Sequence, residues 1–200
     1  QIAPLLGGLF VIGAVFVAAY ELTPFKIPNT WWAVLLCLVA DDLRYYWFHR
    51  ISHERRWFWA SHVIHHSSQH YNLTTALRQT WTGNILASLL FKTPLVFMGF
   101  HPAMVAFVGA ISLLYQFWIH TELIDRMGPF EWIFNTPSHH RVHHATNPRY
   151  LDRNYAGVFI VWDRIFGTFQ EELDEEPVIF GVTVPLASWN PLWANLQVYA

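Results

Sequence analysis

Histidines at three places in the chain recur at spacings that suit metal binding. Residues 49–53 carry H-x-x-x-H, and residues 62–66 and 140–144 both carry H-x-x-H-H. Positions i, i+3 and i+4 share one face of a helix, so the rings of each stretch can point at one target. Neutral imidazole offers a lone pair near physiological pH. Eight such ligands exceed the needs of one ion and suit two ions in one pocket. The candidates are His49, His53, His62, His65, His66, His140, His143 and His144.

The composition indicates that these histidines belong to an integral membrane protein. The 200 residues are 54% hydrophobic and only 13% charged, whereas soluble domains carry about 25% charged residues. A helix of roughly 20 apolar residues crosses a bilayer. We therefore expect an all-α, multi-pass bundle of four transmembrane helices within a single membrane domain. The expected spans are residues 2–20, 31–48, 83–98 and 102–119, and the expected metal-binding cap comprises residues 49–80 and 120–200.

The order of the expected spans brings the histidines to one side of the membrane. If each of the last three spans crosses once, all three histidine stretches lie on the same face. Most arginines lie there too, against Lys26 alone in the first opposite loop, so the positive-inside rule predicts a cytoplasmic site. His120 ends the fourth span at this face and is a ninth candidate ligand; the alternative is an interfacial or capping histidine. The single Cys37 excludes an internal disulfide.

Charged residues inside the expected spans need a specific explanation. Asp42 precedes His49 by about two turns and is a candidate to accept the other ring N–H of a ligand histidine. An interfacial pair between Asp41 and Arg44, at i and i+3, is an equally good interpretation. Lys92, in the third span, either extends toward the membrane surface or lines a cavity, and the sequence favours the first.

Further polar residues close to the histidine stretches are candidates for supporting roles. Glu54 directly follows His53 and is the acid we expect to act in catalysis; the alternative is an exposed partner for a neighbouring arginine. His139 lies off the face that carries the third cluster, so we expect it behind the ligands. Asn154 supports either a ligand or the turn that follows it. Asp163 is one of the acids that can offset the charge of the ions.

Several stretches carry a family resemblance. They are the YYWFHR of residues 45–50, the YNLTTALRQ of 71–79, the YQFWIHTE of 115–122 and the NTPSHHRVHH of 135–144. With the histidine pattern, they resemble the membrane fatty acid hydroxylase/sterol desaturase superfamily over about residues 42 to 191, most closely its alkylglycerol-oxidising branch. His70 departs from that branch, which has an acidic residue near this point.

The resemblance implies an oxygen-dependent lipid oxidoreductase. Its expected cofactors are two iron ions, and its expected partners are a membrane lipid substrate, O₂ and an external electron donor. In the alkylglycerol branch it implies hydroxylation beside the ether oxygen, giving a hemiacetal that falls apart to aldehyde and glycerol. Tetrahydrobiopterin is the reductant that the animal members imply. Imidazole binds zinc as well as iron, so the sequence does not fix the metal.

Two other functions remain open from the sequence. One is a desaturase or hydroxylase of sterols, fatty acids or carotenoids, which would use the same metal core. The other is a metal transporter or sensor without redox chemistry, which should carry its ligands near the middle of the spans rather than at their ends. Motifs for phosphate, dinucleotide or nucleic-acid binding and for a serine nucleophile are absent from the sequence. The oligomeric state is not predicted.

Overall fold

The computed structural model describes residues 2–80, 84–188 and 190–198, with backbone alone for 2–7 and 84–88. These residues form helices joined by loops and no strand, apart from two isolated antiparallel bridges, Phe134 with Phe159 and Ala145 with Phe180. The expected all-α class is therefore confirmed.

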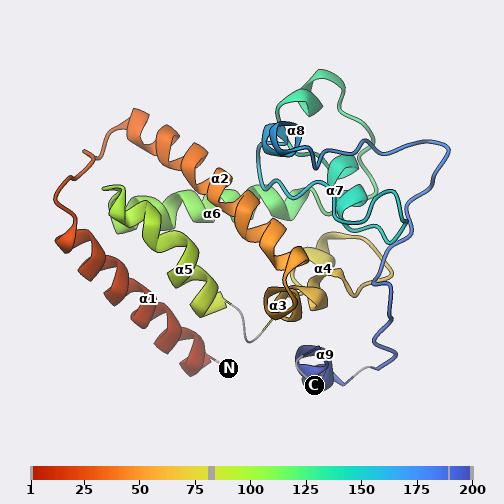
Figure 1. Cartoon of the computed structure of the whole chain (residues 1–200), viewed down its shortest axis with the longest axis horizontal. Coiled ribbons are helices and arrows are strands. Elements are labelled where there is room, and N and C mark those ends of the chain that lie inside the picture. The colour runs from red at the N-terminus through yellow and green to blue at the C-terminus, as the bar shows by residue number, and fades with distance from the viewer. Residues whose placement is uncertain (1, 81–83, 189, 199–200) are drawn as a thin grey trace.

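Four long helices lie side by side in one half of the molecule (Figure 1). They are α1 (Ile2–Leu22), α2 (Trp31–Glu54), α5 (Asn84–Phe97) and α6 (Pro102–Trp118). These helices match the four predicted apolar segments, and Gly83 of the third segment lies outside the described residues. Helix α2 continues beyond the segment predicted for it, so the turns that carry His49 and His53 extend the same helix out of the bundle.

The four helices pack through small and branched side chains. Ala33 and Cys37 of α2, and Val105 and Val108 of α6, are fully buried in one apolar cluster. Small side chains let helices approach closely, and β-branched ones fill the grooves between them. This packing fixes the relative position of α2 and α6, which matters because both helices end at histidines.

A tight turn between α5 and α6 is held by the loop that precedes α2. Gly99 adopts φ of 97°, and a Cβ there would lie 2.7 Å from the Phe25 carbonyl oxygen. The carbonyl of Gly99 accepts a hydrogen bond from the Ile27 N–H at 2.9 Å. Only glycine combines this backbone conformation with so close an approach. The turn therefore closes the end of the bundle that lies far from the histidines.

The predicted membrane crossing has no support from helix length and hydropathy. Within the residues that the structure describes, no helix is both long enough and apolar enough to cross a bilayer.

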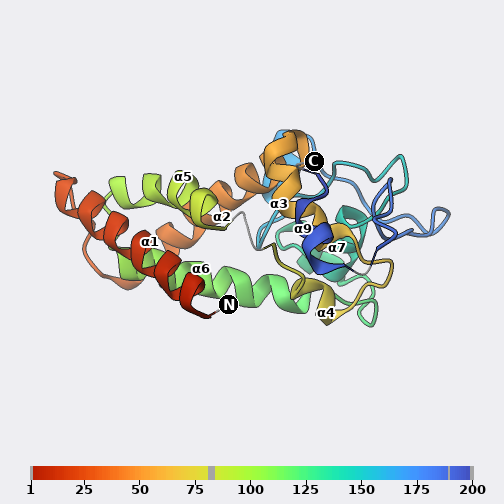
Figure 2. The same cartoon turned by 90° about the horizontal axis from the view of Figure 1, so that it is seen from below.

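Shorter helices form a cap at one end of the four long ones (Figures 1 and 2). They are α3 (Arg56–His66), α4 (Leu73–Ala76), the 3₁₀ helix η1 (Gly128–Trp132), α7 (Pro137–His143), α8 (Val161–Phe166) and α9 (Pro191–Leu196). Pro137 starts α7, where its fixed φ suits a first turn. Helix α3 ends at His66, so His70 falls beyond the helical face that carries the second cluster, and it is exposed.

Candidate metal centre

All nine candidate histidines lie together, in two groups. Within each group the candidate ligand atoms lie within 4.8 Å of one another. The five-histidine group consists of His49, His53, His62, His66 and His143. The four-histidine group consists of His65, His120, His140 and His144.

Each group draws on several helices, because the spacing within one helix directs neighbouring histidines to different groups. On α3, His62 and His66 join the five-histidine group, while His65 joins the four-histidine group. His66 and His144 come from different groups, yet their rings stack with centroids 4.3 Å apart. The two groups are therefore neighbours within a single polar core.

The ring nitrogens are spaced as ligands of an ion would be. In the five-histidine group, His62 Nε2 lies 2.9 Å from His49 Nε2 and 3.1 Å from His66 Nε2. In the four-histidine group, His120 Nε2 lies 3.3 Å from His65 Nε2 and 3.1 Å from His140 Nε2. Ligand nitrogens about 2.1 Å from a shared ion are separated by roughly 3.0 to 3.4 Å in octahedral or tetrahedral geometry. The observed separations fit this range.

Several ring nitrogens in the two groups have no hydrogen-bond partner in the described structure, although they are buried. They include the Nε2 atoms of His53, His143 and His144. Buried polar atoms are normally paired, and an unpaired one needs an explanation such as a bound ion. The donor set, neutral nitrogens in a closed pocket, is chemically suited to a divalent transition metal.

Burial keeps these imidazoles neutral. It lowers the pKa of His65 to about 3, with the neighbouring His120 adding to the effect. It also lowers the pKa of His120 to about 4. The pKa values of the other members of both groups are lowered too, because burial and nearby imidazoles disfavour the charged form. At neutral pH every member therefore has a lone pair to offer.

Backbone carbonyls orient three of the rings. His49 Nδ1 donates to the Tyr155 carbonyl at 2.8 Å, and His143 Nδ1 donates to the Arg153 carbonyl at 2.9 Å. His120 Nδ1 donates to the Gln116 carbonyl at 2.7 Å. A proton held on Nδ1 leaves Nε2 as the free lone pair, which fixes the tautomer that binds metal.

The segment 152–155 supplies most of the outer contacts of the five-histidine group. Besides the two carbonyls, Asp152 Oδ1 lies 3.6 Å from His53 Nδ1. Asp152 and Asn154 both adopt positive φ, 58° and 55°, a conformation that costs free energy for residues other than glycine. The surrounding contacts hold the segment in this shape, in which its carbonyls reach the rings.

Asn154 and Asp163 lie one layer behind this segment and hold it in place. The side chain of Asn154 donates to the carbonyls of His139 and Gln170, at 3.0 and 2.7 Å. The Asp163 carboxylate accepts from the N–H groups of Tyr155 and Ala156, both at 2.8 Å. Burial raises the pKa of Asp163 to about 6, and the donors around it act in the opposite direction. Both residues thus act on the histidines through the backbone.

The remaining predicted supporting residues lie farther from the ring nitrogens. Asp42 accepts from the N–H groups of Val158 and Phe159, at 2.7 and 2.8 Å, and so joins α2 to the segment before α8. Glu54 is half-exposed and accepts from Arg50 Nε at 2.7 Å. The ring of His139 packs edge-on against Phe169. The structure brings none of these three side chains into either histidine group.

Two features of the site were not found from the sequence. Backbone carbonyls that orient rings, such as those of Arg153 and Tyr155, have no signature in the side chains. The second feature is an ion pair between Arg141 of α7 and Glu172, with Arg141 Nη2 2.7 Å from Glu172 Oε2. The position of Arg141 inside H-x-x-H-H, and the acidic run at 171–176, were the only available signals.

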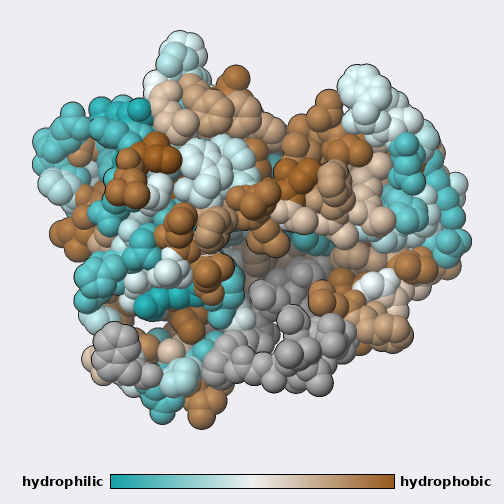
Figure 3. All heavy atoms as spheres, turned by 180° about the vertical axis from the view of Figure 1, so that it is seen from behind, coloured by the Kyte–Doolittle hydropathy of each residue, from teal (hydrophilic) through white to brown (hydrophobic). Residues whose placement is uncertain are grey.

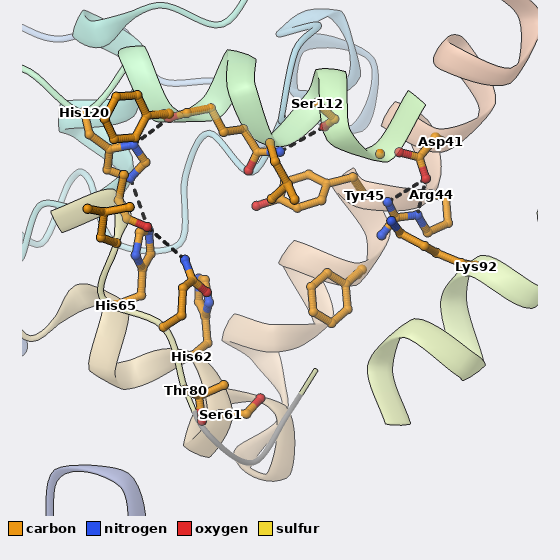
Figure 4. A pocket seen from close by; sticks show the side chains of 18 of the residues that line it. Asp41, Arg44, Tyr45, Ser61, His62, His65, Thr80, Lys92, Ser112 and His120 are labelled. Carbon is orange, nitrogen blue, oxygen red and sulfur yellow. Dashed lines mark hydrogen bonds and ion pairs between the residues drawn. The ribbon is translucent and has the colours of Figure 1, made fainter. Parts of the chain in front are cut away.

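A cavity of about 580 Å³ leads away from the histidines. One end is lined by His62, His65, His120 and His140. The other end, which we call the polar end, is lined by Asp41, Arg44 and Lys92 (Figure 4). Arg44 Nη2 lies 2.7 Å from Asp41 Oδ1, as the pair interpretation expected. Lys92 lines the cavity rather than extending to the surface, which is the alternative that the sequence did not favour.

Comparison with known proteins identifies the class. The fatty acid hydroxylase family model matches residues 34–168, and the chain belongs to this family. Among individual proteins, the chain is similar to alkylglycerol monooxygenase of Xenopus tropicalis, with 50% identity over 87% of this chain and 37% of the relative. The human alkylglycerol monooxygenase is 49% identical over 84% of this chain and 36% of its own length.

More distant similarity extends to other lipid hydroxylases. The ornithine lipid hydroxylase of Rhizobium tropici is 28% identical over 94% of this chain and 58% of its own length. The chain therefore spans little more than a third of the length of the alkylglycerol monooxygenases it matches. No solved structure matches the chain.

Proposed function

We propose that the chain forms the catalytic core of a membrane monooxygenase that oxidises ether lipids. In this proposal two iron ions occupy the two histidine groups and use O₂, with electrons from an external donor, to hydroxylate the carbon beside the ether oxygen. The resulting hemiacetal falls apart to an aldehyde and a glycerol. Tetrahydrobiopterin is the first reductant to test.

One observation carries the proposal: nine buried, neutral imidazoles form two adjacent groups at one end of a cavity. Attack on an unactivated C–H bond needs a strong oxidant, and a pair of iron ions supplies one when it reacts with O₂ and two electrons. The residues of the chain hold the ions, fix the ring tautomers and exclude water. A site made of histidine alone leaves the positive charge of the ions largely uncompensated, which distinguishes it from carboxylate-rich di-iron bundles.

The shape of the site also argues against transport of the metal. The histidines belong to the end of α2, to α3, to the residue just beyond α6 and to α7, so they gather in one closed cap. A pathway through a bundle would instead distribute ligands along the length of its helices. The cavity walls between the two ends include apolar residues such as Phe48 and Phe117, which suit a hydrocarbon chain.

The surface supports a membrane location, which is part of the proposal. Large apolar side chains on the long helices point outward, among them Phe10, Trp31 and Leu114, which are 78%, 76% and 72% exposed. Figure 3 shows hydrophobic side chains over the middle of one face, between more hydrophilic ends. Exposed apolar area on this scale marks contact with lipid or another protein. We propose that the long helices lie in the bilayer and that the cap faces the cytoplasm.

The proposal is tested with purified full-length protein loaded anaerobically with iron. It is incubated under O₂ with an alkylglycerol, a sterol or a fatty acid, and with either tetrahydropterin or reduced ferredoxin. We expect fatty aldehyde from the alkylglycerol and no product from the other two. A hydroxylated sterol or a new double bond would assign the same metal core to a different lipid. Absence of turnover, together with metal passing across vesicles, would overturn the enzyme assignment.

A further inference from the structure

The polar end of the cavity contains an acceptor that the protein leaves unpaired. Asp41 is 1% exposed, and its Oδ1 accepts from Arg44 Nε and Nη2 at 3.1 and 2.7 Å. Its Oδ2 is buried and has no hydrogen-bond partner in the described structure. An unpaired carboxylate oxygen in a closed site costs free energy of the order of 1–3 kcal/mol. A donor group on a bound molecule would remove this cost.

A cation stands beside this acceptor because the facing helix makes room for it. Lys92 of α5 lines the same end of the cavity as Asp41 and Arg44 (Figure 4). A Cβ on Gly109 of α6 would lie 2.6 Å from Lys92 Nζ, so the missing side chain provides the space for the ammonium. Since Arg44 already pairs with Asp41, the Lys92 ammonium is the group available to bind an oxygen lone pair.

We propose that the polar end binds the free hydroxyl groups of the substrate, and that this contact selects an unesterified glycerol ether. The inference rests on the function proposed above. A vicinal diol offers what the two groups lack, because one hydroxyl donates to Asp41 Oδ2 and an oxygen of the pair accepts from Lys92. A phosphate would suit Lys92 but brings no donor for Asp41. A plain hydrocarbon suits neither group.

The length of the cavity agrees with this choice. Asp41 and His49 are eight residues apart on α2, which corresponds to about 12 Å along the helix axis. In a glycerol ether the carbon beside the ether oxygen is five bonds from the terminal hydroxyl oxygen. An extended chain covers about 1.2 Å per bond, so these bonds span roughly half of that distance. The hydrogen bond at one end, and the atoms between the imidazoles and the reacting carbon at the other, occupy the remainder.

The test compares binding of two ether lipids that differ only in their hydroxyls. The probes are 1-O-hexadecylglycerol and its analogue with both hydroxyls capped as methyl ethers, bound anaerobically to metal-loaded full-length protein. We expect wild type to bind the diol about 10- to 100-fold more tightly, as the loss of hydrogen bonds to charged groups predicts. In Asp41→Asn, the amide nitrogen would replace the unpaired oxygen with a donor, and this preference should disappear.

Two further variants keep the test valid if Asp41→Asn does not fold. Gly109→Ala should displace the Lys92 ammonium and weaken binding of the diol alone, and Lys92→Met should do the same. Lys26→Met, at an exposed lysine paired with Glu21, is the matched control and should change neither affinity. Iron content is measured in every variant, to show that the histidine groups are intact.

The outcomes separate this inference from the proposed function. Equal weakening of both probes in the Asp41 and Lys92 variants would mean that these residues only stabilise the fold, and would overturn the inference. Tighter binding of the 3-phosphate than of the diol to wild type would also overturn it. Aldehyde formation under O₂ is measured separately. A diol preference without aldehyde would leave the binding site standing and refute the proposed reaction.

Discussion

The two histidine groups differ in what surrounds them. The five-histidine group is supported from behind by one segment, with the Arg153 and Tyr155 carbonyls on two rings and Asp152 near a third. In the four-histidine group, three members line the cavity, whereas only His62 of the other group does so. Outer contacts orient ligands and raise metal affinity. The comparison indicates that one group is built to retain its ion and the other to leave it accessible to reactants.

Removal of one ligand from each group is expected to have the largest effect. His120→Ala leaves three imidazoles in the accessible group, so we expect the iron content to fall from two per chain toward one. Aldehyde formation should fall by more than the roughly 100-fold that loss of an outer contact costs. Iron is measured by elemental analysis and aldehyde by chromatography.

His53→Ala is the matched variant in the other group. It leaves four imidazoles, so we expect close to two irons per chain and a smaller loss of turnover. Equal loss of iron from the two variants would remove the distinction between the groups.

Gradual removal of metal should release the two ions at different chelator concentrations. The ion in the accessible group should leave first, because fewer outer contacts hold its ligands. Each loss should lower the melting temperature, since the ions bind the folded state and stabilise it by mass action. Iron content and thermal unfolding are followed together as chelator is added. Release of both ions in a single step would show that the groups are equivalent.

The support behind the five-histidine group is tested by Asp163→Asn. The amide cannot accept from both Tyr155 and Ala156 N–H groups as the carboxylate does, so the Tyr155 carbonyl should lose its position against His49. We expect about a 10- to 100-fold weaker affinity for one ion and little change for the other. Chelator competition gives both affinities. Asp174→Asn, at an exposed acid paired with Arg126, should change neither.

The smallest effect is expected where the acidic run meets α7. Glu172→Gln weakens the half-buried pair with Arg141, which lies between two ligand histidines. A charged hydrogen bond contributes about 2 kcal/mol, which corresponds to a fall of roughly 4–8 °C in melting temperature for a domain of this size. Glu175→Gln is the control, because Glu175 is exposed and lies 3.9 Å from Arg149. A matching fall in the control would show that the pair with Arg141 is not special.

The helices and the grouping of the histidines follow from patterns in the sequence. The four apolar segments correspond to α1, α2, α5 and α6, and the H-x-x-H-H spacing places three rings on the side of α3 that meets α7. His120 joined the site because it ends a helix that packs beside α2. Periodicity is a local property, and local properties can be read from the sequence.

The supporting layer could not be predicted, because it depends on contacts between distant residues. Asp42 reaches Val158, and Asp163 reaches the segment whose Tyr155 carbonyl holds His49. Nothing in the sequence around Asp42 distinguishes a carboxylate that faces an imidazole from one that accepts backbone N–H groups. Lys92 illustrates the same point, since its place in the cavity depends on the absence of a side chain at Gly109.

The central claim is that two ions lie side by side, each held by imidazoles alone from the protein. X-ray absorption spectroscopy of the anaerobically loaded protein, combined with iron analysis, tests it most directly. The account predicts two irons per chain, an inner shell of nitrogen ligands about 2.1 Å from each iron, and scattering from a second iron nearby. One iron per chain, or two irons without a detectable neighbour, would contradict it.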